Sequence, residues 1–206
     1  EVVETLAERD LAMPEVTDPT VIAVSQLLDR LLIPCLQCAP DTYVWLAIAS
    51  RKLWVTHGPS PALVRAASLA MPLVLASRLG AYREARAVAR YAVLIGETRR
   101  YVLATATARH VYAIATQHWG GPLEDTLFEA RQAHEALVRG GDLQFACLTY
   151  HATAPALFDS APLLQTTEDE LAAGLAFAQR TGNQFAQGFY LSYRQLLRTL
   201  QADSVN

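Results

Sequence analysis

The sequence is poor in several kinds of residue, and each shortage excludes a class of protein. Three cysteines in 206 residues cannot build a disulfide framework, and reduced cysteines are typical of a cytosolic protein. Charged residues make up only 18% of the chain, below the average of about 25%, and the net charge is −3. Without an excess of Lys and Arg, the chain is not expected to neutralise the phosphates of a nucleic acid.

The most apolar run is short for a membrane span. It extends from Ala66 to Ala76 and contains Ser68 and Pro72, whereas a helix needs about 20 apolar residues to cross a bilayer. The sequence therefore predicts no transmembrane helix, no membrane partner and a cytoplasmic location. The chain opens at Glu1 without an initiator Met or a signal-peptide pattern, and we expect it to be a fragment of a longer polypeptide.

Signatures of common enzyme chemistry are also missing. The sequence has no Gly-rich phosphate loop with Lys-Ser/Thr, no His-Glu-x-x-His and no Gly-x-Ser-x-Gly. The histidines are scattered over the predicted helices, and no two of them are three or four residues apart on one helix, so no helix carries a metal-ligand pair, although a site assembled across helices stays open. They are His57, His110, His118, His134 and His151. We expect no enzyme activity, no catalytic residues, no metal and no cofactor in this chain.

Cys35 and Cys38 have the spacing of a redox or metal-binding pair. No second pair accompanies them, and Pro34 and Pro40 bracket them, which predicts a loop between two helices. Two small buried thiols in that loop are the preferred interpretation. A redox or metal role for the pair stays open.

Helix signals recur from end to end, and no segment alternates strictly between apolar and polar residues as a half-buried strand does. Asp18-Pro19 and Ser60-Pro61 each predict a helix start, and Pro34 predicts a helix end. Thr167 and Glu170 have the spacing of a capping box. The predicted helices span residues 19–33, 41–57, 61–78, 82–96, 99–118, 122–139, 143–158, 168–180 and 184–200. The sequence therefore predicts an all-α protein of about nine helices.

The glycines between these helices are periodic. Gly80 and Gly120 mark one pair of equivalent turns, and Gly141 and Gly182 mark another, each pair separated by about 40 residues. A helix of such a pair cannot bury its apolar face alone, so neighbouring pairs must stack. We expect one domain over residues 1–206, an α-α superhelix of antiparallel helix pairs.

The segment from Leu79 to Val93 resembles the turn of a tetratricopeptide repeat. The matching residues are Gly80, Tyr82, Glu84, Ala85, Ala89 and Ala92. The preceding helix lacks the Trp and Gly of that family, and the repeats are longer than its usual length of about 34 residues. The resemblance is therefore to a degenerate, tetratricopeptide-like solenoid.

Three further segments are similar to the helical region that follows the AAA-type ATPase module in large bacterial signalling proteins. They are Met13 to Pro19, Gly80 to Tyr82 and Gly140 to Ala146. That family includes combined Ser/Thr kinase, ATPase and sensor histidine kinase polypeptides. The resemblance implies a cytoplasmic regulatory segment of a multidomain protein, with the ATPase, kinase or cyclase domains outside these residues. Its partners would be other domains of the same polypeptide or a separate protein.

Candidate binding residues follow from the same resemblance, because in tetratricopeptide-like arrays the first helix of each pair lines the concave face. Polar and aromatic residues recur there at steps of three and four. They are Tyr101, Thr105, Arg109, Tyr112, Thr116, Gln187, Tyr190 and Arg194. Arg offers a bidentate fork for a carboxylate or phosphate, and Tyr combines apolar area with a hydrogen-bonding tip. The alternative is that each residue is half-buried and bonded between helices.

Two functions compete. The first is a non-catalytic interaction domain that transmits a signal through protein contacts. The alternative is a small-molecule sensor that encloses its ligand in the concave groove, as in the maltotriose-responsive transcription activators that the architecture resembles. A closed polar pocket lined by Arg109 and Tyr112 would favour the sensor, whereas an open apolar groove would favour a protein partner.

Five aromatic residues at helical spacing are predicted to lie in the core: Trp45, Trp54, Tyr91, Phe128 and Phe177.

Overall fold

The computed structural model describes residues 8–203, and α-helices with short connections make up nearly all of this range. The elements are α2 (Pro19–Cys38), α3 (Pro40–His57), α4 (Pro61–Leu79), α5 (Tyr82–Thr98), α6 (Val102–Ala115), the 3-10 turn η1 (Gln117–Trp119), α7 (Leu123–Arg139), α8 (Leu143–Leu148), α9 (Tyr150–Ser160), α10 (Leu164–Thr181) and α11 (Gln184–Asp203). Residues 8–203 contain no strand. The prediction of an all-α chain is confirmed.

The predicted helix starts depend on local capping. The Asp18 carboxylate accepts a hydrogen bond from the backbone N–H of Thr20 at 2.7 Å, and Pro19 occupies the first position of α2. The Ser60 hydroxyl accepts from the N–H of Leu63 at 3.3 Å at the start of α4. Both starts were predicted and are confirmed.

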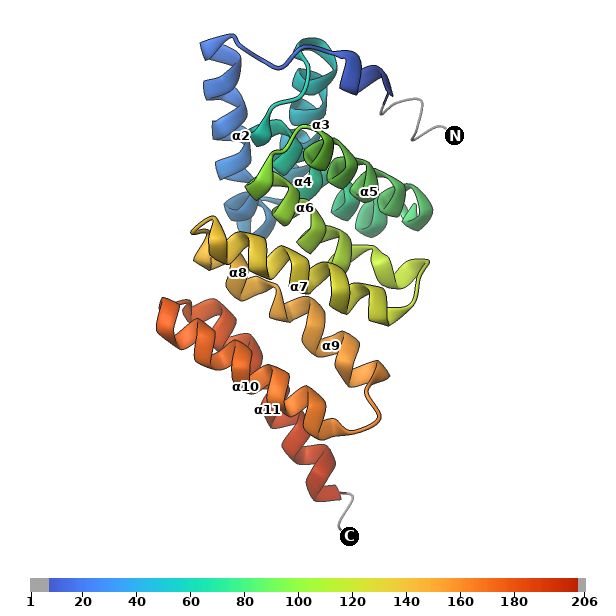
Figure 1. Cartoon of the computed structure of the whole chain (residues 1–206), viewed down its shortest axis with the longest axis vertical. Helices are drawn as coiled ribbons and strands as arrows, with labels where there is room; N and C mark the ends of the chain where they lie inside the picture. Colours follow the sequence, from blue (N-terminus) through green and yellow to red (C-terminus); the bar gives the residue numbers. More distant parts are fainter. Residues whose placement is uncertain (1–7, 204–206) are drawn as a thin grey trace.

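Figure 1 shows the helices stacked along the long axis, with α2 to α4 at one end and α10 and α11 at the other. Successive helices pack in neighbouring pairs, among them α4 with α5, α6 with α7 and α10 with α11. One group of buried apolar residues joins α2, α3, α4, α6, α7 and α8, and another joins α8 to α11. The packing of helices in neighbouring pairs, which the glycine spacing predicts, is therefore present.

The α5–α6 pair is packed especially closely. A methyl group placed at Gly96 would overlap the Thr105 hydroxyl and would lie 3.2 Å from Thr105 Cβ. The Thr105 hydroxyl itself donates to the Tyr101 carbonyl at 2.8 Å, so it cannot move aside without losing that bond. This contact sets the distance between the two helices that carry the candidate site.

Two predicted helices have wrong boundaries here. Helix α2 continues through Pro34 to Cys38, because a proline removes only its own N–H bond and the following residues resume the helix. Cys35 and Cys38 therefore lie in the last turn of α2, not in a loop, and Cys38 is exposed. The helix predicted over 143–158 is divided into α8 and α9 at Thr149, whose hydroxyl donates to the Ala146 carbonyl at 2.7 Å.

The predicted capping box is also wrong. Helix α10 begins at Leu164, so Thr167 lies buried within the helix instead of at its start. Glu170 does not turn back to the backbone; it accepts a hydrogen bond from the Thr153 hydroxyl of α9 at 2.5 Å. This bond between helices replaces the local one that the spacing predicted.

Burial was only partly predictable. Trp54 and Tyr91 are buried in the core and Phe177 packs against it, as expected. Trp45 and Phe128 are 63% and 61% exposed, so their predicted core positions are wrong. On α2 the buried face is Val21, Ser25, Leu28 and Leu32. Val24, Leu27 and Leu31 are also apolar but are exposed, because α2 lies at the end of the stack.

Two described helices, α2 and α4, are long and apolar enough to cross a membrane, although the run from Ala66 to Ala76 alone is not. Core helices of soluble proteins have the same length and composition. Helix α4 holds such a core position, because it packs against α2, α3, α5 and α6. The cytoplasmic location stays a prediction.

Candidate functional site

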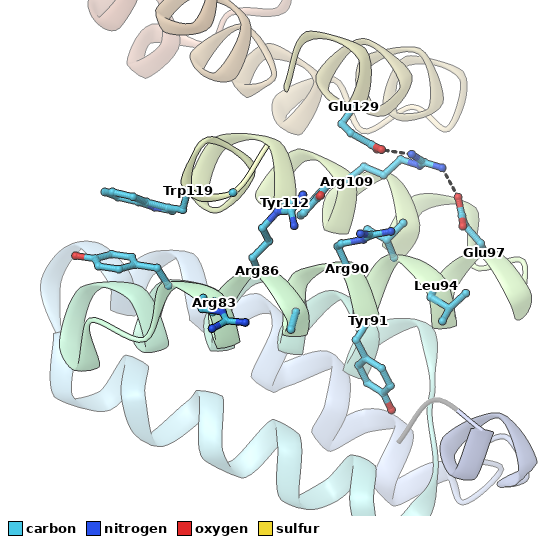
Figure 2. Close-up of a pocket in the computed structure, with 14 residues that line it drawn as sticks. Arg83, Arg86, Arg90, Tyr91, Leu94, Glu97, Arg109, Tyr112, Trp119 and Glu129 are labelled. Carbon is cyan, nitrogen blue, oxygen red and sulfur yellow. Dashed lines mark hydrogen bonds and ion pairs between the residues drawn. The ribbon is translucent and has the colours of Figure 1, made fainter. Parts of the chain in front are cut away.

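A groove of about 790 Å³ lies between α5, α6, η1 and α7 (Figure 2). Helix α5 supplies most of its lining, α6 and η1 form one wall, and Glu129 enters from α7. Its volume is within the range of about 300–1,000 Å³ that is typical of small-molecule sites. The groove is therefore the candidate functional site.

Arginines dominate the polar lining. Arg83, Arg86 and Arg90 follow one face of α5 at steps of three and four residues, and Arg109 reaches in from α6. The acidic residues of the lining are Glu97 and Glu129, so four positive and two negative charges leave a local net charge of +2. The whole chain has a net charge of −3, so positive charge is concentrated at this site.

Arg86 is held in a fixed position. Its Nη2 donates to Gln117 Oε1 at 3.3 Å, and its guanidinium lies 5.9 Å from the centre of the Tyr112 ring. Gln117 is fully buried, and its amide donates to Asp125 at 3.2 Å. The turn at Gly121 permits this approach, because a Cβ there would overlap Gln117 Nε2 and lie 3.2 Å from Arg86 Nη2. One donor of the guanidinium, Nε, is buried without a hydrogen-bond partner.

Arg109 has a different role, because it joins the helices around the groove. Its two terminal nitrogens form ion pairs with Glu97 of α5 and Glu129 of α7 (Figure 2). Glu129 is 20% exposed and Glu97 is 44% exposed, so the pair with Glu129 is the better shielded from water. Arg109 thus bridges α5, α6 and α7 at one end of the groove.

Arg83 and Arg90 are exposed and form no ion pair with a carboxylate within residues 8–203. In Figure 2, Arg90 lies between Arg86 and Arg109. Arg86 and Arg90 are four residues apart on one helix face, and like charges at that spacing repel each other. An anion between the two guanidinium groups would relieve this repulsion.

Aromatic rings form the other end of the groove. The rings of Tyr82 and Trp119 are stacked with centroids 4.3 Å apart, and the His118 ring lies 4.7 Å from Trp119. Trp119 is 52% exposed, so much of its ring remains open to solvent. Figure 2 places Trp119 at the opposite end from Glu97.

The structure brings only two of the sequence-predicted site residues into this groove, Arg109 and Tyr112. Tyr101 and Thr105 are buried, and the hydroxyl of Thr116 donates to the Tyr112 carbonyl at 3.0 Å. The other three lie on α11, which is not part of the groove lining. There Gln187 donates to the Ala178 carbonyl, Tyr190 is fully buried and donates to the Cys147 carbonyl, and Arg194 is half-buried. The predicted stripe is therefore not one surface, and a binding role for its members stays a prediction.

Sequence reasoning missed Arg83, Arg86, Arg90 and Trp119. A signal for the three arginines was present, since their spacing of three and four places them on one helix face. No comparable signal marks Trp119, which comes into the groove only through the packing of η1 against α5 and α7.

Two of the histidines, His110 and His151, have a pKa below the usual value for histidine. Burial, with a smaller contribution from the charge of His151, lowers the pKa of His110 to about 3. Burial also lowers the pKa of His151 to about 4. Within residues 8–203, no group of three or more His, Cys, Asp or Glu side chains is placed to hold a metal ion. The arginines of the groove can bind an anion.

Comparison with family models, with curated proteins and with solved structures gave no match. The likeness to tetratricopeptide arrays, and to the helical region that follows AAA-type ATPase modules, accordingly stays a prediction from the sequence.

Proposed function

We propose that this chain is a non-catalytic helical-repeat sensor domain, with a tetratricopeptide-like superhelix, and that it binds a small anionic ligand in the α5–α6–α7 groove. The observation that carries the proposal is the set of arginines on α5. Arg83 and Arg90 have no carboxylate partner in the described chain, and Arg86 is aimed by Gln117 and Tyr112. Arginine forks bind carboxylates and phosphates through paired hydrogen bonds.

The charged residues of the lining favour a small anion over a wholly apolar protein segment at this place, although Val93, Leu94 and other apolar side chains share the lining. Grooves for amphipathic helices are lined by apolar side chains. Here four arginines and two glutamates surround the cavity, together with Tyr112, which is buried in its wall. The regulatory role, the cytoplasmic location and the origin in a bacterial multidomain protein belong to the same proposal and rest on the sequence resemblance.

The test is a thermal-shift and calorimetric titration with inorganic pyrophosphate at low ionic strength. The native chain should bind it, and Arg86→Gln/Arg90→Gln should lose most of the affinity. Arg131→Gln/Arg198→Gln is the matched control, because it removes two charges from exposed arginines on α7 and α11. Equal loss in both double variants would mean that binding follows net charge and would contradict the proposed site.

A second function, docking of a protein partner, is favoured by a different observation. Helices α2 and α3 expose large apolar side chains, with Leu27 at 62%, Trp45 at 63% and Ile48 at 58% exposure. Exposed apolar patches mark protein contacts. The partner would be another domain of the same polypeptide or a separate protein. Co-purification with the neighbouring domains of the full-length protein, lost in Trp45→Ser/Ile48→Ser but not in Arg86→Gln/Arg90→Gln, would support it.

A further inference from the structure

We infer that the ligand of the α5–α6–α7 groove is a nucleotide, with its phosphates between Arg86 and Arg90 and its base on the Trp119 ring. This inference rests on the proposed anion-binding function and names the chemical class of the ligand. It comes from the order of the side chains along the groove, which are aromatic at one end and cationic along the middle (Figure 2). A nucleotide has the same order, a flat aromatic base followed by negative charge.

The aromatic end fits a base. Tyr82 and Trp119 are already stacked on each other, so one face of the indole is supported while much of its surface is open to solvent. A second planar ring would add to this stack beside His118, whose ring is tilted by 47° against the indole. Stacking of a base on an aromatic side chain strengthens binding and tolerates any base, because every base has a flat face.

The cationic part fits two or more phosphates. Arg86 and Arg90 are one helical turn apart, about 6 Å along the axis, so their guanidinium groups can bind successive phosphates of one chain. A carboxylate ligand with a single charge would satisfy only one of the two arginines.

The spacing along α5 links the two ends. Tyr82 precedes Arg86 by four residues and Arg90 by eight, which corresponds to about 6 and 12 Å along the helix axis. A base stacked at Tyr82 and Trp119 would therefore have its sugar beside the first turn of α5 and its phosphates beside the next two turns. The groove volume of about 790 Å³ leaves room for the whole molecule.

The test compares three probes by isothermal titration calorimetry: ADP, adenosine and inorganic pyrophosphate. We expect ADP to bind about tenfold more tightly than pyrophosphate, since one stacked base has an effect of this order. Trp119→Ala should reduce the affinity for ADP to that for pyrophosphate and leave pyrophosphate binding unchanged. Trp45→Ala is the control, because Trp45 is similarly exposed but lies on α3. Arg86→Gln/Arg90→Gln should weaken both phosphorylated probes.

The results can distinguish failure of the nucleotide inference from failure of the proposed anion-binding function. If pyrophosphate and ADP bind equally and Trp119→Ala changes neither, the nucleotide inference is overturned while the anion site stands. If neither binds to the native chain, both fail. A Glu-rich peptide that binds in competition with pyrophosphate and more tightly than ADP would overturn the nucleotide inference in favour of an acidic protein segment.

Discussion

Gly96 of α5 and Thr105 of α6 are in such close contact that no side chain fits at position 96. Gly96→Ala should therefore destabilise the chain by about 1–3 kcal/mol, because overpacking outweighs the gain in helix propensity. Gly188→Ala is the matched control, since a Cβ at Gly188 within α11 meets nothing within 4 Å. The control should stabilise the chain by about 0.5–1 kcal/mol. Urea unfolding of both variants measures the difference, and a stabilised Gly96→Ala would show that α5 and α6 are less tightly packed.

Glu129 competes with an anionic ligand for Arg109, so its removal should favour binding. Glu129→Gln raises the net charge of the groove lining from +2 to +3 and frees one side of the Arg109 guanidinium. We expect a several-fold higher affinity for pyrophosphate together with a small loss of stability. Glu135→Gln, at an exposed residue of the same helix, is the control for overall charge. Weaker pyrophosphate binding in Glu129→Gln would indicate that the bridge to α7 is needed to shape the groove.

Arg65 of α4 ties two distant parts of the chain together. Its Nε lies 3.3 Å from Asp29 of α2, its Nη1 lies 3.0 Å from Asp142 at the start of α8, and its guanidinium lies over the Phe145 ring. Burial raises the pKa of Asp29, while the charge of Arg65 opposes that rise. Arg65→Met leaves both carboxylates without this partner and should cost about 2 kcal/mol, less than a fully buried pair because Arg65 is 24% exposed.

A double-variant cycle checks this assignment. Asp29→Asn should recover part of the stability in the Arg65→Met background, because it removes one of the two stranded charges. In the native background the same change should be destabilising, because it breaks an existing ion pair. If the two effects are equal, Asp29 and Arg65 do not interact, and the cost of Arg65→Met comes from lost packing on Phe145.

His110 should make the chain sensitive to acid. In the unfolded chain its pKa is about 6.5, whereas burial lowers it to about 3 in the folded chain. Between these values the unfolded state binds a proton that the folded state does not, so the free energy of unfolding decreases as the pH falls from about 6.5 towards 3. Above pH 6.5 both states hold a neutral His110, and this contribution no longer changes with pH.

The measurement is urea unfolding between pH 4.5 and 7.5, a range that extends about one unit above the unfolded-state pKa of about 6.5 and stays above the folded-state pKa of about 3. His110→Leu should reduce the slope of stability against pH by up to about 1.4 kcal/mol per unit in the acidic range. His57→Gln, at an exposed residue of α3, is the control for removing a histidine. An unchanged slope in His110→Leu would mean that His151 or another group carries the acid response.

The elements that the sequence predicted correctly depend on local interactions. Asp18 and Ser60 cap their helices through bonds to residues two or three positions away, so their effect can be recognised from the order of residues alone. One wrong boundary arose where a tertiary contact decided the outcome, because Glu170 bonds to Thr153 on another helix instead of closing a capping box. The end of α2 has a local reason, because Pro34 removes only its own N–H bond and the helix continues to Cys38.

The buried residues and the site residues also divide into those set by local spacing, which were predicted, and those set by tertiary contacts, which were not. The helical spacing of Trp45 and Phe128 matched a core position, but whether a helix face is covered depends on which neighbours the stack supplies. Arg109 and Tyr112 were recognised because they share a polar and aromatic stripe on α6. Their groove partner Arg86 lies on α5, and the packing of η1, with Gln117 against Arg86, completes the site. Such a contact between elements cannot be inferred from residue spacing.

The most direct measurement is a crystal structure of the chain grown in the presence of inorganic pyrophosphate. We expect phosphate oxygens about 2.7–2.9 Å from the guanidinium nitrogens of both Arg86 and Arg90, the distance of a charge-assisted hydrogen bond. A groove without an anion, while pyrophosphate occupies exposed arginines elsewhere on the chain, would contradict this expectation.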